Sequence, residues 1–148
     1  MTTNIATTKE QSARLLQCGV SAESADMSWV RGAANVSDGN LSLHPYRRMQ
    51  RINWQSMRGR SEIAPAWSLS ALLSLLPKEI KVDESPYDEV QKYGLLIYPF
   101  MGGWQIDYQY CIDDECHSLK CIHSTDIIEV CVKAIEWLTA NNYKLNEL

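Results

Sequence analysis

Apolar positions recur at helical spacing in three parts of the chain. A first helix is predicted from Lys9 to just before Gly19, because "ARLL" supplies a short apolar face and the glycine suits a helix end. Leucines spaced three and four residues apart predict a second helix, with Ser68 or Ser70 as its cap and Pro77 as its stop. The strongest helical pattern is "IIEVCVKAIEWL", after Ser124, whose apolar stripe is broad enough to pack across a sheet.

The stretch "SAESADMSWV" predicts a turn followed by a further short helix. Ser21 is placed to cap it, and the helix would bring Met27, Trp29 and Val30 to the core. Residues 31 to 64 mix Gly, Asn, Ser and Pro without a sustained period of 2 or 3.6 residues. We therefore expect an irregular or loop-rich segment there.

Alternation of apolar and polar residues predicts a β-hairpin over residues 93 to 110. The runs "YGLLIYPF" and "WQIDYQY" are joined by "MGGW", in which Gly102 and Gly103 suit a tight turn that needs positive φ. In the second run, Trp, Ile and Tyr alternate with Gln and Asp, so one face is expected to meet a core and the other solvent. A third strand, "SLKCIHS", is expected after the acidic turn.

These elements predict an α+β fold. A small antiparallel sheet of three or more strands packs against the C-terminal helix, with the two earlier helices beside it. The length of 148 residues, with 45% hydrophobic and 22% charged residues, is typical of one globular domain, so we expect a single domain over residues 1 to 148. Residues 1 to 8 are small and polar and are expected to fray. No pattern in the chain predicts an oligomeric state.

The sequence predicts a cytoplasmic protein with no membrane partner. No apolar run reaches the roughly 18 residues that a membrane span needs, and the start "MTTNIATTKE" lacks the charged and apolar regions of a signal peptide. The five cysteines, an odd number, are then expected to be reduced thiols.

Charge is distributed unevenly along the chain. Residues 31 to 60 carry six arginines against one aspartate, a net of +5, whereas residues 79 to 148 carry thirteen acids against five lysines, a net of −8. In "HPYRRMQRINWQSMRGR", arginines are interleaved with two aromatic residues, which suits a protein contact or a nucleic acid with its phosphates and bases. The overall charge of −4 disfavours a polyanion, so a protein partner is preferred. The candidate surface comprises Tyr46, Arg47, Arg48, Arg51, Trp54, Arg58 and Arg60.

A second candidate lies in "YCIDDECHSLKCIH", which gathers residue types that bind zinc. Their spacing, C-x4-C-H-x3-C-x-H, contains no paired C-x2-C turns, and strand geometry sends adjacent cysteine and histidine side chains to opposite faces. A metal site and a redox or disulfide pair remain alternatives, but ordinary thiols of a turn and strand are favoured, and no cofactor is expected. The residues concerned are Cys111, Cys116, His117, Cys121 and His123.

Three stretches carry a resemblance to a known family: "EQSARLLQCGVSAESADMSW", "APAWSLSALLSLLPKEI" and "IIEVCVKAIEWLTANNY". They cover 54 of the 148 residues and resemble small proteins encoded on prophages and mobile elements of gut anaerobes. In that family a Gln-Ser-x-x-Leu-Leu helix precedes an Ala-Asp-Met segment, a Trp-Ser-Leu helix, a hairpin and a C-terminal helix. Asn141-Asn142 stands where the family has Asn-Gly, a change that a left-handed helix end tolerates. The resemblance implies no catalytic residue.

No motif for nucleophilic catalysis, metal hydrolysis or phosphate binding is present in the sequence. The favoured function is therefore a non-enzymatic protein-binding or regulatory module. The resemblance implies that this module belongs to a phage or mobile element and contacts a host or phage protein. One alternative is a nucleic-acid-binding accessory protein that uses the arginine segment 46 to 60. A further alternative is a small metal-dependent or thiol enzyme.

Overall fold

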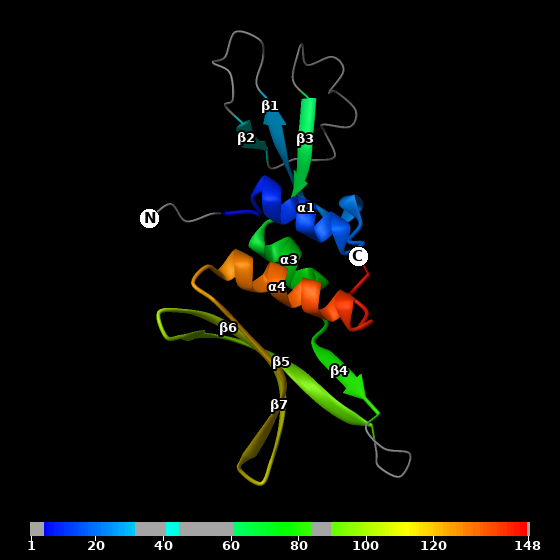
Figure 1. Ribbon diagram of the computed structural model, residues 1–148, viewed down its shortest axis with the longest axis vertical. Coiled ribbons are helices and arrows are strands. Elements are labelled where there is room, and N and C mark those ends of the chain that lie inside the picture. The colour runs from blue at the N-terminus through cyan, green and yellow to red at the C-terminus, as the bar shows by residue number, and fades with distance from the viewer. Residues whose placement is uncertain (1–4, 32–40, 45–60, 84–89, 148) are drawn as a thin grey trace. The chain divides into compact units, whose positions relative to one another are not determined.

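The computed structural model describes residues 5–31, 41–44, 61–83 and 90–147. It has the predicted α+β fold, with antiparallel sheets and a C-terminal helix (Figure 1). The chain divides into two compact units, Met1–Leu73 and Ser74–Leu148, and each is described by itself. The described residues form two sheets where the sequence analysis expected one: a three-stranded sheet in the first unit and a four-stranded sheet in the second.

The first unit begins with helix α1 (Lys9–Gln17), as predicted. The Thr8 side chain accepts a hydrogen bond from the Gln11 N–H, and the Gln11 side chain accepts one from the Thr8 N–H, so the two residues form a capping box. Gly19 follows the helix with a φ of 92°, a conformation that favours glycine. Within the start that the sequence predicts to fray, Ala6 pairs with Ser68.

The predicted helix over Met27, Trp29 and Val30 is wrong. Ser21 caps a helical turn as expected, but this is only a 3-10 turn, η1 (Ala22–Ser24), and strand β1 (Met27–Arg31) follows it. β1 is the central strand of its sheet, so both of its edges have backbone partners, and Val30 is fully buried. This two-sided pairing satisfies more backbone groups than one short helix would.

Two further strands complete the first sheet: β2 (Leu41–His44) and β3 (Ser61–Ala66), in the order β2-β1-β3. Both lie largely within the segment that the sequence analysis expected to be irregular. Three small or flexible side chains form a core cluster here, and two larger ones pack against it: Ala6, Met27 and Ala66, with Trp29 and Leu43. The next residue after β3, Trp67, is fully buried, and its Nε1–H donates to Ser24 Oγ at 2.9 Å.

Helix α3 (Leu69–Leu75) confirms the second predicted helix. The Ala71 N–H donates to Ser68 Oγ at 3.2 Å, which identifies Ser68 as the cap. Pro77 follows one residue after the buried Leu76, consistent with its predicted role as the stop.

The second unit contains a four-stranded antiparallel sheet in the order β4-β5-β6-β7. β4 (Glu79–Val82) is short, whereas β5 (Gln91–Phe100), β6 (Gly103–Ile112) and β7 (Glu115–Ser124) are long and joined by two tight hairpins. The predicted hairpin and third strand are thereby confirmed. In Figure 1 the β6–β7 turn is the part of this sheet farthest from α4.

The turn between β5 and β6 differs from the predicted one by one residue. Its central residues are Met101 and Gly102, with φ of 50° and 75°, and not the two glycines. Gly103 already belongs to β6 opposite Phe100, and it is buried. A Cβ atom there would lie 2.4 Å from the Ser124 carbonyl oxygen, so this glycine is required by close backbone approach and not by turn geometry.

Helix α4 (Ile127–Ala140) packs on β6 and β7, as its broad apolar stripe predicts. Asp126 accepts a hydrogen bond from the Glu129 N–H at 2.9 Å and caps the helix. The sheet face toward the helix carries the buried residues Ile106, Tyr108 and Ile122. At the other end Asn142 adopts a φ of 62°, which confirms that asparagine serves as the left-handed end residue.

The close approach at Gly103 generates the first testable prediction. Changing Gly103 to Ala is expected to destabilise the protein by about 1–3 kcal/mol, because the added methyl meets backbone atoms of Ser124 and Thr125 that have no room to move. Urea unfolding measures the effect. The matched control is Gly94→Ala, where the nearest atom would be 3.9 Å away, and equal destabilisation of both variants would contradict this account.

Candidate functional site

The arginine-rich candidate surface, residues 46 to 60, lies outside the described residues. Its predicted role in contacting a protein or nucleic acid stays a prediction. The sites that the structure does describe are in the second unit: the β6–β7 hairpin, one face of the four-stranded sheet, and the outer edge of β4.

In the β6–β7 hairpin, Cys111 and Cys116 form a disulfide, with a Cα–Cα distance of 4.0 Å. The expectation that all five cysteines are reduced is wrong for this pair. A two-residue turn at Asp113-Asp114 places Cys111 and Cys116 directly opposite each other, at a non-hydrogen-bonded position where cross-strand side chains are closest. The signal was present in the sequence, since the two cysteines are spaced symmetrically about the acidic pair.

The other residues of this stretch that could bind zinc lie apart from one another. His117 points to the opposite face from the disulfide and stacks on the Tyr110 ring, with 4.8 Å between ring centroids. Cys121 lies opposite Asp107, and His123 Nε2 is 3.0 Å from the Phe100 carbonyl oxygen. Within the described ranges, no three His, Cys, Asp or Glu side chains are grouped so that they could hold a metal ion.

The turn that closes this hairpin is held in an unfavourable conformation. Asp113 and Asp114 have φ of 50° and 66°, in the left-handed region that favours glycine. Glu115 adds a third adjacent carboxylate, and its nearest cation candidate is His117, 3.9 Å away. The disulfide therefore closes a turn that backbone preference and charge repulsion both oppose.

The three free cysteines differ in exposure and reactivity. Cys131 lies on the buried face of α4, and burial, with a smaller effect of Asp126, raises the pKa of its thiol to about 12. Cys121 is exposed, yet desolvation and the neighbouring Asp107 carboxylate raise its pKa, while Gln105 and Lys120 act in the opposite direction. A thiol with a raised pKa is a weak nucleophile at neutral pH, which is the reverse of what a thiol enzyme requires.

The face of the four-stranded sheet away from α4 carries an apolar stripe along β5. Leu96, Tyr98 and Phe100 alternate onto this face, and the side chains of Leu96 and Phe100 are 42% and 48% exposed. Met101, at the adjoining turn, is 81% exposed. We call these four residues the β5 stripe. Apolar groups that gather on one exposed face are typical of binding surfaces.

Neighbouring contacts hold the β5 stripe in place. The Tyr98 and Phe100 rings meet edge to face at 6.4 Å, and the Phe100 ring meets His123 in the same way at 6.3 Å. The Gln105 side-chain amide donates to the Tyr98 hydroxyl at 2.8 Å. A surface ordered before binding loses less side-chain entropy when a partner arrives.

Asp107 lies on the same face but is only 6% exposed, a departure from the solvent position predicted for it. The Ser118 hydroxyl donates to its carboxylate at 2.6 Å. The hydrogen bond offsets part of the desolvation of this carboxylate in the middle of the sheet.

Two lysines meet at the β4 end of this face. Lys81 and Lys92 are directly opposite each other on β4 and β5, and both side chains are exposed. Like charges at directly opposed strand positions repel. No carboxylate among the described residues lies within 4 Å of either ammonium group, so the repulsion is not offset within that part of the chain.

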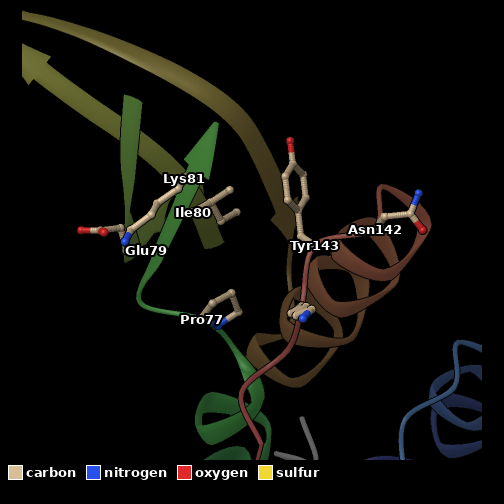
Figure 2. A pocket seen from close by; sticks show the side chains of 7 residues that line it. Pro77, Glu79, Ile80, Lys81, Asn142 and Tyr143 are labelled. Carbon is tan, nitrogen blue, oxygen red and sulfur yellow. The ribbon is translucent and has the colours of Figure 1, made fainter. Parts of the chain in front are cut away.

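Beside the outer edge of β4 lies a cavity of about 390 Å³ (Figure 2). One wall is β4 with Pro77 before it, and the other wall is the segment 142–144 after α4. In Figure 2 the Tyr143 ring stands across the opening from Ile80. The lining residues are Pro77, Glu79, Ile80, Lys81, Asn142, Tyr143 and Lys144.

Interactions on both sides fix these walls. The buried Tyr108 hydroxyl donates to the Pro77 carbonyl at 2.8 Å, and burial, with a smaller contribution from Cys131, raises the Tyr108 pKa well above its usual value. Trp137 stacks on Tyr108 and contacts the Tyr143 ring, with 5.3 Å between the latter two centroids. The Asn146 side chain donates to the carbonyls of Ser74 and Leu76, which ties the C-terminal segment to the start of this unit.

The sequence analysis missed both the β5 stripe and the β4 edge. The alternation in "GLLIYPF" contained a signal for the stripe, since Leu, Tyr and Phe occupy every second position. β4 itself, within "KEIKV", carried only four residues of alternating pattern and was too short to detect. Comparisons with protein-family models, curated proteins and solved structures found no match to this chain. Among the described helices, none has the length and apolar character to cross a membrane.

The cysteine arrangement predicts a definite labelling pattern. With the native protein at pH 8 and no reductant, an alkylating reagent is expected to modify Cys121 and, more slowly, the half-buried Cys18, but not the buried Cys131. Unfolding exposes Cys131 to the reagent, and reduction of the disulfide then allows the reagent to modify Cys111 and Cys116 as well. Peptide mass spectrometry reads the pattern, and labelling of Cys111 or Cys116 before reduction would contradict the disulfide.

The acidic turn generates a stability prediction of unusual sign. Changing Asp114 to Gly is expected to raise the free energy of unfolding by about 0.5 kcal/mol, because glycine adopts positive φ without a Cβ clash and one like charge is removed. The matched control, Glu115→Gly, removes the same charge at a strand position and is expected to destabilise by about 0.5–1 kcal/mol. Chemical unfolding of both variants tests the difference, and stabilisation by both would assign the effect to charge alone.

Proposed function

We propose that this chain is a non-enzymatic protein-binding module whose contact surface is the uncovered face of its four-stranded sheet. The observation that carries the proposal is the β5 stripe, in which Leu96, Phe100 and Met101 are exposed side by side on strand and turn. Fully burying an exposed Leu or Phe side chain stabilises by about 1.5–3 kcal/mol, and a partner that covers the exposed parts of Leu96, Phe100 and Met101 would gain a share of this free energy.

The partner's chemistry follows from the charge around this face. On this face Asp107 lies near the middle of the sheet, and Lys81 and Lys92 lie at the β4 end. A partner that presents an apolar patch to the β5 stripe and an acidic group toward the two lysines complements this face. Preorganised aromatic residues near the centre of such a contact are typical of binding hot spots.

The biological setting is also part of the proposal. The resemblance to small prophage and mobile-element proteins supports a host or phage protein as the partner, met in the cytoplasm. In that compartment the exposed Cys111–Cys116 disulfide would exchange with the cellular thiol pool. The nucleic-acid alternative depends on residues 46 to 60 and is separated from protein binding by the test below.

Substitution of the stripe tests this function. The double variant Phe100→Ser, Met101→Ser is expected to lose the partner, with a fall in affinity of about 30-fold or more for a hot-spot aromatic residue. The measurement is affinity capture from the native host, followed by titration of the purified partner against wild-type and variant chains. The partner is expected to persist after nuclease digestion.

The matched control is Ile112→Ser, which removes an equally exposed apolar side chain (56%) from the other hairpin turn and is expected to keep the partner. Unfolding curves establish that both variants remain folded. A partner that binds the double variant as tightly as wild type contradicts the β5 stripe as the contact. Loss of every captured protein after nuclease digestion would instead favour the nucleic-acid alternative.

A further inference from the structure

The outer edge of β4 presents backbone groups that have no strand partner among the described residues. The Leu95 N–H donates to the Lys78 carbonyl at 2.9 Å, which makes Lys78 and Leu95 a hydrogen-bonded pair in the β4–β5 register. Because such pairs alternate along antiparallel strands, Ile80 and Val82 bond to β5, whereas Glu79 and Lys81 direct their N–H and C=O groups away from the sheet. β4 is the last strand on this side of the four-stranded sheet.

The outward N–H and C=O groups of Glu79 and Lys81 lie beside the cavity of Figure 2. Glu79 and Lys81 line it together with Ile80 and, on the far wall, Tyr143 and Lys144. A strand laid along this edge would alternate its side chains between the two sheet faces. A residue opposite Ile80 would place its side chain on the α4 side, in the cavity next to Ile80 and Tyr143. A residue opposite Lys81 would place its side chain on the other face, beside the Lys81–Lys92 pair.

The charged side chains at this edge determine which kind of segment can bind there. The opposed lysines Lys81 and Lys92 repel each other, and Lys144 adds a third cation at the cavity. A carboxylate on the added strand opposite Lys81 would lie next to Lys81, on the side away from Lys92, and its attraction to Lys81 would offset part of that repulsion. Opposite Glu79, by contrast, an acidic residue would be repelled. The edge therefore complements a segment with an apolar residue opposite Ile80, an acid opposite Lys81 and no acid opposite Glu79.

We propose that the outer edge of β4 accepts an extended segment of a partner protein as an added strand, with an apolar side chain in the cavity and an acidic side chain opposite Lys81. This inference rests on the proposed function in that the occupant is a protein, but it uses none of the residues of the β5 stripe. Backbone hydrogen bonds supply the affinity of such strand addition, and the side-chain positions supply its specificity.

Two synthetic peptides test the proposal on the full-length, disulfide-bonded chain. The first is Ser-Thr-Val-Glu-Val-Thr-Ser, and the second has Lys in place of Glu. In ¹⁵N-resolved NMR titrations, the acidic peptide is expected to shift the amide signals of Glu79, Lys81 and Tyr143 and to bind more tightly than the basic one. In the Lys81→Glu variant the acidic peptide is expected to lose about fivefold in affinity, so that the order of the two peptides reverses.

A backbone variant separates strand addition from simple charge attraction. Glu79→Pro removes an outward N–H that bonds nothing among the described residues, so it leaves the β4–β5 pairing intact and is expected to abolish binding of both peptides. The charge control is Lys120→Glu on β7, which changes net charge equally at the opposite edge strand and is expected to keep the wild-type preference.

Several results would overturn the proposal: no binding of either peptide, equal binding of both, or shifts at Leu96 and Phe100 instead of β4. Concentration-dependent shifts at β4 without peptide would identify a second copy as the occupant and also overturn it. If the Glu79→Pro variant does not fold, the test rests on whether the Lys81→Glu variant reverses the order of affinity of the two peptides. A negative result leaves the capture test of the β5 stripe unaffected, because its variants lie on different strands.

Discussion

The burial of β6 against α4 is the interaction on which the second unit depends. Ile106 and Tyr108 are fully buried on this face, and Ile128, Val132 and Ile135 of the helix are buried as well. Tyr108 does more than fill space, since its hydroxyl bonds the Pro77 carbonyl and its ring stacks on Trp137. A unit of this size has little core to spare, so each of these contacts is a sizeable fraction of its stability.

One helix covers only one face of the sheet, and the candidate surfaces follow from that. Alternate residues of β5 point away from α4. They include Leu96 and Phe100, which are exposed, and Tyr98, which is half-buried. Stability does not require apolar groups at these positions, where polar residues serve equally well in half-buried sheets. Gln105 and His123 hold the Tyr98 and Phe100 side chains in place. A binding surface requires such ordering, whereas an apolar surface without a function does not.

The β6–β7 hairpin combines a covalent link with a turn that its residues disfavour. Two aspartates at positive φ and a third adjacent acid oppose closure, and the disulfide between Cys111 and Cys116 holds the strands together just before them. The bulge after Tyr108 and the exposed Lys120 interrupt the free edge of β7, which protects that edge from pairing with other strands. β4 also carries an exposed lysine, Lys81, but its pairing with β5 has no bulge and its edge lies beside a cavity.

Local periodicity in the sequence determined α1, α3, α4, the hairpin over residues 93 to 110 and the face to which its aromatic residues point. These features depend on contacts a few residues apart, so the pattern of apolar positions is sufficient to predict them. β1 was predicted as a helix because its pairing with β2 and β3 involves residues far along the chain. The symmetric spacing of Cys111 and Cys116 about Asp113-Asp114 was a sequence signal for their link, but only the position of the turn showed that the two cysteines lie opposite each other.

The opposition of Lys81 and Lys92, the outward backbone groups of β4 and the cavity beside Tyr143 were decided by the tertiary structure alone. The sequence places Lys81 eleven residues before Lys92 and more than sixty before Tyr143. Only the register of antiparallel pairing, and the anchoring of the C-terminal segment by Asn146, bring them to one edge. Register and anchoring are long-range contacts whose free energy arises when the whole unit folds, and no local pattern of residues encodes them.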